Sequence, residues 1–187
     1  MGRVMSYDIH LIDQTTNETA QVPGHLMIGG TFKTDYHPET GTFTPALNTD
    51  AALNITYNYG HYYYEVFSEK GIKEIYGKSG AESIPILETM INRIKQKYHN
   101  GNDWITTKRE IMVAYDENGN EIDPNNVIEY ILGSKRGEKY TSEQKIVDWY
   151  EGPNSDYWAS TAANALRPLY QLLALAKMRP DCIWDGD

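Results

Sequence analysis

The chain has 187 residues, with 26 acidic and 17 basic side chains and a formal net charge of −9. No window approaches the roughly 18 consecutive apolar residues of a membrane-spanning helix, and a single cysteine, Cys182, excludes an intrachain disulfide framework. The acidic charge disfavours a dedicated nucleic-acid binder, which needs a basic surface to displace counterions. Because residues 1–13 lack a basic segment followed by an apolar one, we expect no signal peptide and a cytoplasmic location.

The first third of the sequence predicts strands. Apolar residues alternate with polar ones at Tyr7, Ile9 and Leu11, which is the period of a strand with one buried face. Residues 25–32 predict a second strand, interrupted by consecutive glycines at 29 and 30. Turn residues such as Pro38 and Gly41 predict an exposed loop or small hairpin across residues 34–50.

A tyrosine-rich segment follows. Alternation of apolar and polar residues predicts a strand from Leu53 to Tyr59, and strand-forming residues continue it from Tyr62 to Phe67. Five tyrosines lie within eight residues of this segment: Tyr57, Tyr59, Tyr62, Tyr63 and Tyr64. A strand with this composition displays phenols on both faces of a sheet, where they serve either the core or an interface.

Two longer helices are predicted. Apolar residues spaced three and four apart indicate a helix over residues 83–98, with Ser83 as its N-cap. A second apolar stripe predicts a helix over residues 156–178, capped by Ser155 and kinked at Pro168. Trp184 is expected to fold back onto the core that these helices cover.

The segment between the helices is more polar. Alternation at residues 111–115 and the dipeptide Asn118-Gly119 predict a tight β-hairpin. A short helix is expected from Asp123 to Leu132, and a further helical turn at residues 146–150. We expect residues 134–153 to be dispensable for folding but needed for binding.

These elements predict an α+β fold. An antiparallel sheet of four to six strands is built from residues 5–67, to which the 111–122 hairpin can be added, with the helices 83–98 and 156–178 packed on one face. The whole chain, 1–187, is expected to form one domain, with residues 99–155 as an elaboration or insertion.

Patterns that would indicate metal-dependent or nucleophilic catalysis fail on spacing. Counting from Asp116, Gly119 falls at position 4 of a calcium loop that requires glycine at position 6, so a hairpin turn explains it better. Histidines at the helical spacing of a zinc site are missing from the sequence, as are a Gly-x-Ser-x-Gly elbow and a complete phosphate loop. His61 and Glu65 would form at best a weak acid–base pair on one strand face. We therefore expect no catalytic residue, metal or cofactor, and take Cys182 as a structural thiol.

Two stretches of the sequence look familiar together. The first runs from Leu53-Asn54-Ile55-Thr56-Tyr57-Asn58-Tyr59 to Gly80-Ala81-Glu82-Ser83-Ile84-Pro85, and the second contains Asp156-Tyr157-Trp158, Asn164-Ala165, Arg179-Pro180-Asp181 and Trp184-Asp185-Gly186-Asp187. Together they resemble a family of small proteins encoded by phages and prophages of gut bacteria. The resemblance covers roughly residues 5–98 and 156–187, and implies a relation to the anti-CRISPR proteins that inhibit type II effector nucleases. It also implies that the cytoplasm in which the protein acts is that of a bacterial host cell.

We therefore expect a non-enzymatic anti-defence protein that binds a basic host protein, a type II CRISPR effector nuclease, and interferes with its nucleic-acid binding. Neither a membrane nor direct contact with nucleic acid is expected. Acidic and aromatic side chains in the polar segment are the candidate contacts: Glu117, Glu121, Glu138, Tyr140, Tyr150, Glu151 and Asp156. Two alternatives stay open, namely a phage assembly module that self-associates through the tyrosine-rich strand, and an enzyme with an aromatic pocket that collects His61 and Glu65.

Overall fold

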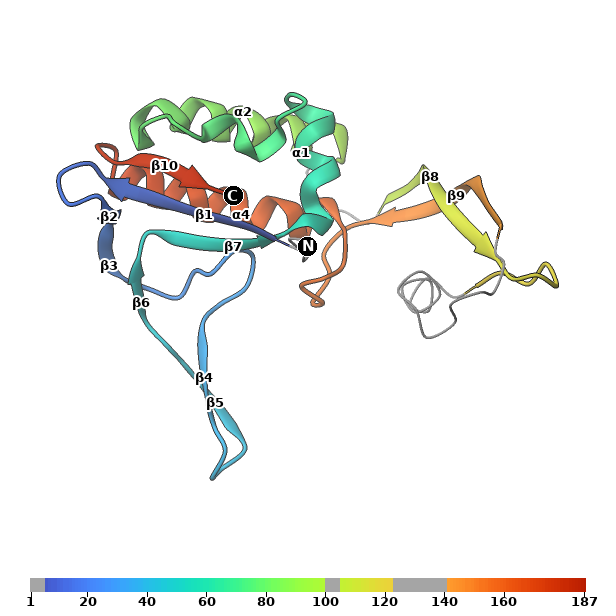
Figure 1. Cartoon of the computed structure of the whole chain (residues 1–187), viewed down its shortest axis with the longest axis horizontal. Helices are drawn as coiled ribbons and strands as arrows, with labels where there is room; N and C mark the ends of the chain where they lie inside the picture. Colours follow the sequence, from blue (N-terminus) through green and yellow to red (C-terminus); the bar gives the residue numbers. More distant parts are fainter. Residues whose placement is uncertain (1–5, 100–104, 123–140) are drawn as a thin grey trace. The chain divides into compact units, whose positions relative to one another are not determined.

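A computed structural model describes residues 6–99, 105–122 and 141–187, and has the predicted α+β fold. The chain divides into two compact units (Figure 1). One unit comprises residues up to 105 together with residues 151–187, and the other comprises residues 106–150. None of the helices in the described ranges is long and apolar enough to cross a lipid bilayer.

Strand β1 (Ser6–Asp13) lies at the centre of the main sheet of the first unit. It pairs antiparallel with β10 (Ile183–Gly186), and on its other side with β7 (Ala52–Thr56) and with β2 (Glu18–Thr19). Tyr7, Ile9 and Leu11 are buried, as their alternation predicts, whereas Asp8 is exposed on the opposite face. One face of this sheet therefore belongs to the core and the other to solvent.

Helices α2 (Gly80–Lys97) and α4 (Ala162–Met178) pack their apolar stripes into this core. Helix α2 begins earlier than predicted, because Ser79 and Glu82 form a reciprocal capping box. Ser83 is instead a buried residue of the first turn, whose hydroxyl donates to the Gly80 carbonyl and accepts the Trp184 indole N–H at 2.8 Å. Trp184 is 1% exposed, which confirms that it folds back onto the core.

The predicted start of the last helix is wrong. Helix α4 begins at Ala162, where the Thr161 side chain accepts the backbone N–H of Asn164. Residues 152–161 form a loop instead, and Asp156 lies in it. The helix continues through Pro168 to Met178 without interruption.

The tyrosine-rich segment is helical from Tyr57 onward, so the predicted continuation of the strand to residue 67 is wrong. A 3₁₀ turn, η1 (Tyr57–Tyr59), leads into helix α1 (Gly60–Val66), and a second turn, η2 (Gly71–Ile75), follows. The buried side chains are Tyr59, Tyr62, Tyr63 and Val66, which are spaced as on one helix face. Burial of that face outweighs the strand preference of individual tyrosines.

Residues 21–50 form a β-arm that leaves the main sheet (Figure 1). At its base β3 (Gln21–His25) pairs with β6 (Asn48–Asp50), and farther out β4 (Thr34–His37) pairs with β5 (Thr42–Pro45). Gly29 lies between the two parts with a φ of +116°, and a Cβ at this position would lie 1.8 Å from the Asn54 carbonyl oxygen. Only glycine fits this close approach.

The second unit contains a two-stranded ribbon, whose strands β8 (Ile105–Tyr115) and β9 (Thr141–Glu151) extend to the unit's boundaries. A turn is present at Asn118-Gly119, but it is longer than the predicted two-residue turn, because the Asp116 N–H donates to the Asn120 carbonyl and a bridge joins Tyr115 to Glu121. The helical turn predicted at residues 146–150 is wrong, because these residues belong to β9. The helix predicted over 123–132 lies outside the described residues.

The Ser83–Trp184 hydrogen bond gives a test of the fold. Ser83→Ala leaves the buried indole N–H without its acceptor, so we expect the free energy of unfolding to fall by about 1 to 3 kcal/mol. Urea unfolding followed by circular dichroism measures this. The exposed Ser142→Ala serves as control, and an unchanged midpoint for Ser83→Ala would contradict the assigned bond.

Candidate functional site

Glu151, one of the predicted contact residues, is buried at the start of α4. Its Oε2 accepts the backbone N–H of Ala162 at 2.7 Å, and the Tyr62 hydroxyl donates to the same oxygen. The residue is 3% exposed. A carboxylate at a helix N-terminus is stabilised by the helix dipole and by N–H groups that lack a partner within the helix. Glu151 therefore stabilises the fold and is not available to a partner, which corrects the prediction.

The loop before α4 is fastened to residues 56–59 by several hydrogen bonds. The Thr56 backbone N–H donates to the Tyr157 hydroxyl at 2.9 Å, and the Asn58 side chain donates to the Trp158 carbonyl at 2.8 Å. Ser160 donates back to the Asn58 carbonyl at 2.7 Å. Residues 56–58 and 157–160 are thus in direct contact, and these hydrogen bonds position the loop.

Asp156 is exposed in this loop, and its Oδ1 accepts the backbone N–H of Trp158 at 2.9 Å. Its carbonyl accepts from the buried side chain of Asn164 at 2.8 Å. The carboxylate therefore shapes the turn while one side of it still faces solvent.

The predicted deletion of residues 134–153 has to be redrawn. It would remove Glu151 from the core of the first unit, so the segment expected to be dispensable for that unit is 106–150.

Glu117 and Glu121 are exposed beside the tight turn of the second unit. Asp116 holds this turn, because its Oδ1 accepts the backbone N–H groups of Asn118 and Asn120 at 2.9 and 2.8 Å. The bond from Asn120 is the main reason that the pKa of Asp116 is lowered. The acidic cluster that imitates a calcium loop therefore has a structural explanation in its own turn.

Tyr150 is 62% exposed, but it lies far from Glu117 and Glu121. The Tyr115 hydroxyl beside the turn donates to Glu143. Glu143 and Tyr150 are seven residues apart on β9, and seven residues of a strand span about 23 Å. The structure therefore does not gather these three predicted contacts into one patch. Glu138 and Tyr140 lie outside the described residues.

One face of the β8–β9 ribbon carries exposed apolar side chains that the sequence analysis missed. Met112 and Ile146 are 67% and 72% exposed. The Lys108–Asp148 ion pair joins even-numbered positions of the two strands, so Met112, Ile146 and Tyr150 share its face by alternation. The Arg109 guanidinium lies over the Trp149 ring, 4.6 Å from its centre, on the other face. Because residues 146–150 were predicted to be helical, the alternation that places Ile146 and Tyr150 on one strand face was not considered.

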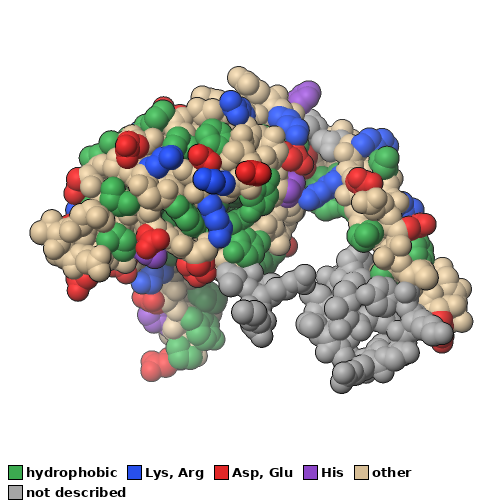
Figure 2. All heavy atoms as spheres, turned by 45° about the horizontal axis from the view of Figure 1, so that its top comes forward, with side chains coloured by type: hydrophobic (Ala, Val, Ile, Leu, Met, Phe, Trp, Pro, Cys, Tyr) green, Lys and Arg blue, Asp and Glu red, His purple; other side chains and the backbone are tan. Residues whose placement is uncertain are grey.

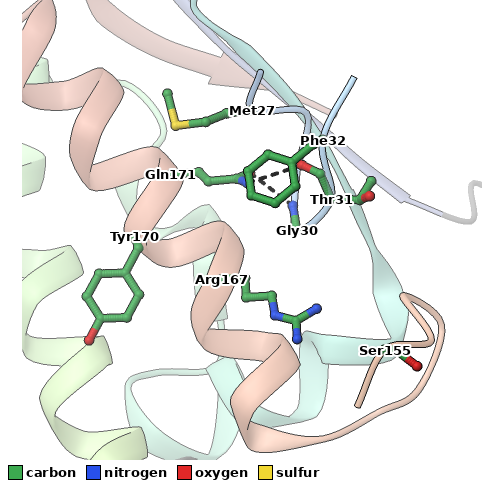
Figure 3. A pocket seen from close by; sticks show the side chains of 8 residues that line it. All are labelled: Met27, Gly30, Thr31, Phe32, Ser155, Arg167, Tyr170 and Gln171. Atoms are coloured by element: carbon green, nitrogen blue, oxygen red, sulfur yellow. Dashed lines mark hydrogen bonds between the residues drawn. The ribbon is translucent and has the colours of Figure 1, made fainter. Parts of the chain in front are cut away.

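A pocket of about 710 Å³ lies between α4 and the loop at residues 27–32 of the β-arm (Figure 3). Its volume is in the range of small-ligand sites, roughly 300 to 1,000 Å³. We call it the α4 groove; its lining residues are Met27, Gly30, Thr31, Phe32, Ser155, Arg167, Tyr170 and Gln171. Arg167 is the charged residue among them.

Gln171 holds the outer wall of the α4 groove. Its carbonyl oxygen accepts the backbone N–H groups of Gly29 and Gly30 at 2.8 and 2.9 Å, and its amide donates to the Thr31 carbonyl at 3.3 Å. Phe32 and Met27 line the same groove as Gln171 (Figure 3). The groove wall is therefore fixed to α4 by a buried side chain, whereas Phe32 remains 64% exposed.

Two other groups of reactive side chains have structural partners. Burial raises the pKa of Glu65, but hydrogen bonds from Lys97 and Tyr98 outweigh this and the pKa is lowered overall. His61 and Glu65 lie one helical turn apart on α1, and neither lines the α4 groove.

Asp13, Asp181 and Cys182 form a group close enough to hold a metal ion. The guanidinium of Arg179 occupies it, donating to Asp13 and to Asp181 at 2.8 Å each. Those bonds lower the pKa of both carboxyls. Burial raises the pKa of the Cys182 thiol to about 11, so the thiol is protonated and unreactive at neutral pH.

Comparisons of the chain with protein-family models, curated proteins and solved structures give no match.

The buried Glu151 carboxylate can be tested separately from any partner. Glu151→Ala leaves the Tyr62 hydroxyl and the Ala162 N–H without this acceptor, so we expect a loss of about 1 to 3 kcal/mol in the free energy of unfolding. Glu121→Ala, at an exposed carboxylate, should change it by less than about 0.5 kcal/mol. Equal effects of the two substitutions in chemical unfolding would show that Glu151 has no special role.

Proposed function

We propose that the chain is a non-enzymatic binding protein that inhibits a basic host protein, of the class of type II CRISPR effector nucleases. The observation that supports binding is the exposed face of the β8–β9 ribbon, where Met112, Ile146 and Tyr150 are each more than 60% exposed. Large apolar side chains that share one exposed face are typical of protein interaction sites. Tyrosine is favoured there, because it combines a large apolar ring with a polar tip.

The charge of the second unit supports a basic partner. Its described residues include six carboxylates and three cationic side chains. Glu117 and Glu121 extend from the turn, and the Lys145 ammonium lies 3.5 Å from Glu121 on an exposed surface. Exposed pairs of this kind contribute little to stability, so a cationic partner can exchange for the lysine at low cost.

The proposed mechanism is occupation of a nucleic-acid site. Arginines and lysines that bind phosphates attract the carboxylates of the ribbon, and the apolar face provides the desolvated contact. Tyr150 is the proposed anchor, with Glu117 and Glu121 of the same unit as outer electrostatic contacts. Glu138 and Tyr140 remain proposed contacts, because they come shortly before β9 in the sequence. The nuclease class itself comes from the family resemblance.

One of the two alternative functions loses the observation that suggested it, and the other gains no support from the α4 groove. Self-association through a tyrosine-rich strand required residues 57–67 to be extended, but they are helical from Tyr57 to Val66, and three of the tyrosines are buried. An aromatic enzyme pocket required His61 and Glu65 to line a cavity with several tyrosines, and neither residue lines the α4 groove.

Binding to a guide-loaded type II effector nuclease tests the proposal. We expect the chain to capture the nuclease at low salt, and target DNA loaded beforehand to reduce the capture. Tyr150→Ala should weaken binding by at least about 30-fold, as removal of an aromatic anchor does. Glu117→Gln with Glu121→Gln should mainly slow association and flatten its dependence on salt.

Met178→Ala provides the matched control, because it removes an exposed apolar side chain from the first unit. This variant should bind the nuclease as the unchanged chain does. The proposal fails if no complex forms at low salt, or if Tyr150→Ala and Met178→Ala bind equally well.

A further inference from the structure

The β4–β5 hairpin of the β-arm has one apolar and one polar face. Tyr36 pairs with Phe43 across the strands, and their ring centres are 5.0 Å apart. On the other face the His37 ring nitrogen and the Thr44 hydroxyl are hydrogen bonded at 2.7 Å. Every residue of both strands is exposed, including Tyr36 at 56% and Phe43 at 67%. An aromatic pair on a projecting hairpin is therefore presented to solvent.

Figure 2 shows hydrophobic side chains gathered along this projecting hairpin, with an acidic side chain towards its tip. Residues 34–45 contain two carboxylates, Asp35 and Glu39, and neither lysine nor arginine. The surface that accepts the hairpin must therefore be apolar and carry positive charge.

The α4 groove of the same unit has those properties. Met27, Phe32 and Tyr170 supply apolar lining, and Arg167 supplies the positive charge. A second cation lies close by, because the Lys95 ammonium is 5.2 Å from the centre of the Tyr170 ring. Neither Tyr36 nor Phe43 lines the groove, so the hairpin does not fill the groove of its own chain.

We infer that the hairpin docks into the α4 groove of a second copy of the chain. Phe32 lines the groove and lies only two residues before β4, so hairpin and groove are neighbours on one surface. A two-fold axis beside the hairpins then gives two identical contacts, each pairing one copy's Tyr36 and Phe43 with the other's groove. Arg167 offsets the negative charge of the incoming hairpin.

The size of this contact predicts a weak dimer. An aromatic side chain has about 200 Å² of surface, so Tyr36 at 56% and Phe43 at 67% exposure together present about 240 Å² to solvent. If each pair covers a similar area of groove, the two contacts bury on the order of 1,000 Å². That total is near the lower limit for specific interfaces. We therefore expect a reversible monomer–dimer equilibrium in the micromolar range. This inference goes beyond the proposed function, and the residues involved differ from those of the β8–β9 ribbon.

Sedimentation equilibrium of the full chain, from about 1 to about 500 µM, tests the dimer over the affinities expected for so small an interface. Phe43→Glu should weaken the dimer by at least about 30-fold. Thr42→Glu adds the same charge to the polar face of the same strand and should leave the dimer within about threefold of the original affinity. Arg167→Glu places a negative charge in the groove and should weaken the dimer as Phe43→Glu does.

Mixing the two defective variants gives the sharpest test. Phe43→Glu keeps an intact groove and Arg167→Glu keeps an intact hairpin, so the mixture regains one of the two contacts. It should form more dimer than either variant forms by itself. The inference is overturned if the unchanged chain stays monomeric throughout the concentration range, if Phe43→Glu and Thr42→Glu behave alike, or if the mixture shows no gain.

Nuclease binding by Phe43→Glu separates this inference from the proposed function. The variant should still bind the nuclease, because its β8–β9 ribbon is unchanged. Circular dichroism and urea unfolding check that each variant is folded, and exposure of Phe43, Thr42 and Arg167 makes a folding defect unexpected.

Discussion

The pairing of β10 with β1 is the contact on which the rest of the first unit depends. β10 completes the sheet beside its central strand and places Trp184 against Ser83 of α2. Its backbone also meets the segment before that helix, because the Gly77 N–H donates to the Trp184 carbonyl and the Trp184 N–H donates to the Lys78 carbonyl. One short strand thus holds the central strand and the start of α2 together.

The chemistry that the first unit buries is used for structure. Glu151 satisfies the start of α4, Gln171 holds the loop at residues 29–31, and Arg179 neutralises two carboxylates. Part of the exposed apolar surface lies on two-stranded elements, namely Tyr36 and Phe43 of the β4–β5 hairpin and Met112, Ile146 and Tyr150 of the β8–β9 ribbon. This division between a satisfied core and apolar exposed ribbons favours binding to macromolecules as the activity of the chain.

Local patterns predicted local structure well. Alternation located β1, the three-and-four spacing located α2 within a few residues, and Asn118-Gly119 located its turn. The same methods failed at the tyrosine-rich segment, because tyrosine favours strands individually while burial of Tyr59, Tyr62 and Tyr63 requires a helical face. The spacing of those residues was a usable signal that their composition concealed.

The candidate site was less predictable, because exposure depends on contacts between distant segments. Nothing near Glu151 in the sequence distinguishes it from Glu121, yet Tyr62 and Ala162 bury the first and leave the second in solvent. Likewise Phe32 and Arg167 meet at one groove although they are far apart in the chain. Such pairs become visible only once the fold has brought their elements together.

The position of β10 in the chain also has a consequence for biosynthesis. Ile9 pairs with Gly186, so the ribosome synthesises the partner of the central strand more than 170 residues after that strand. At typical elongation rates of about 5 to 20 residues per second, this delay is on the order of 10 to 30 seconds. During that time the β10 side of β1 is an open edge that can pair with other extended segments. The nascent chain is therefore most exposed to misassembly before β10 emerges from the ribosome.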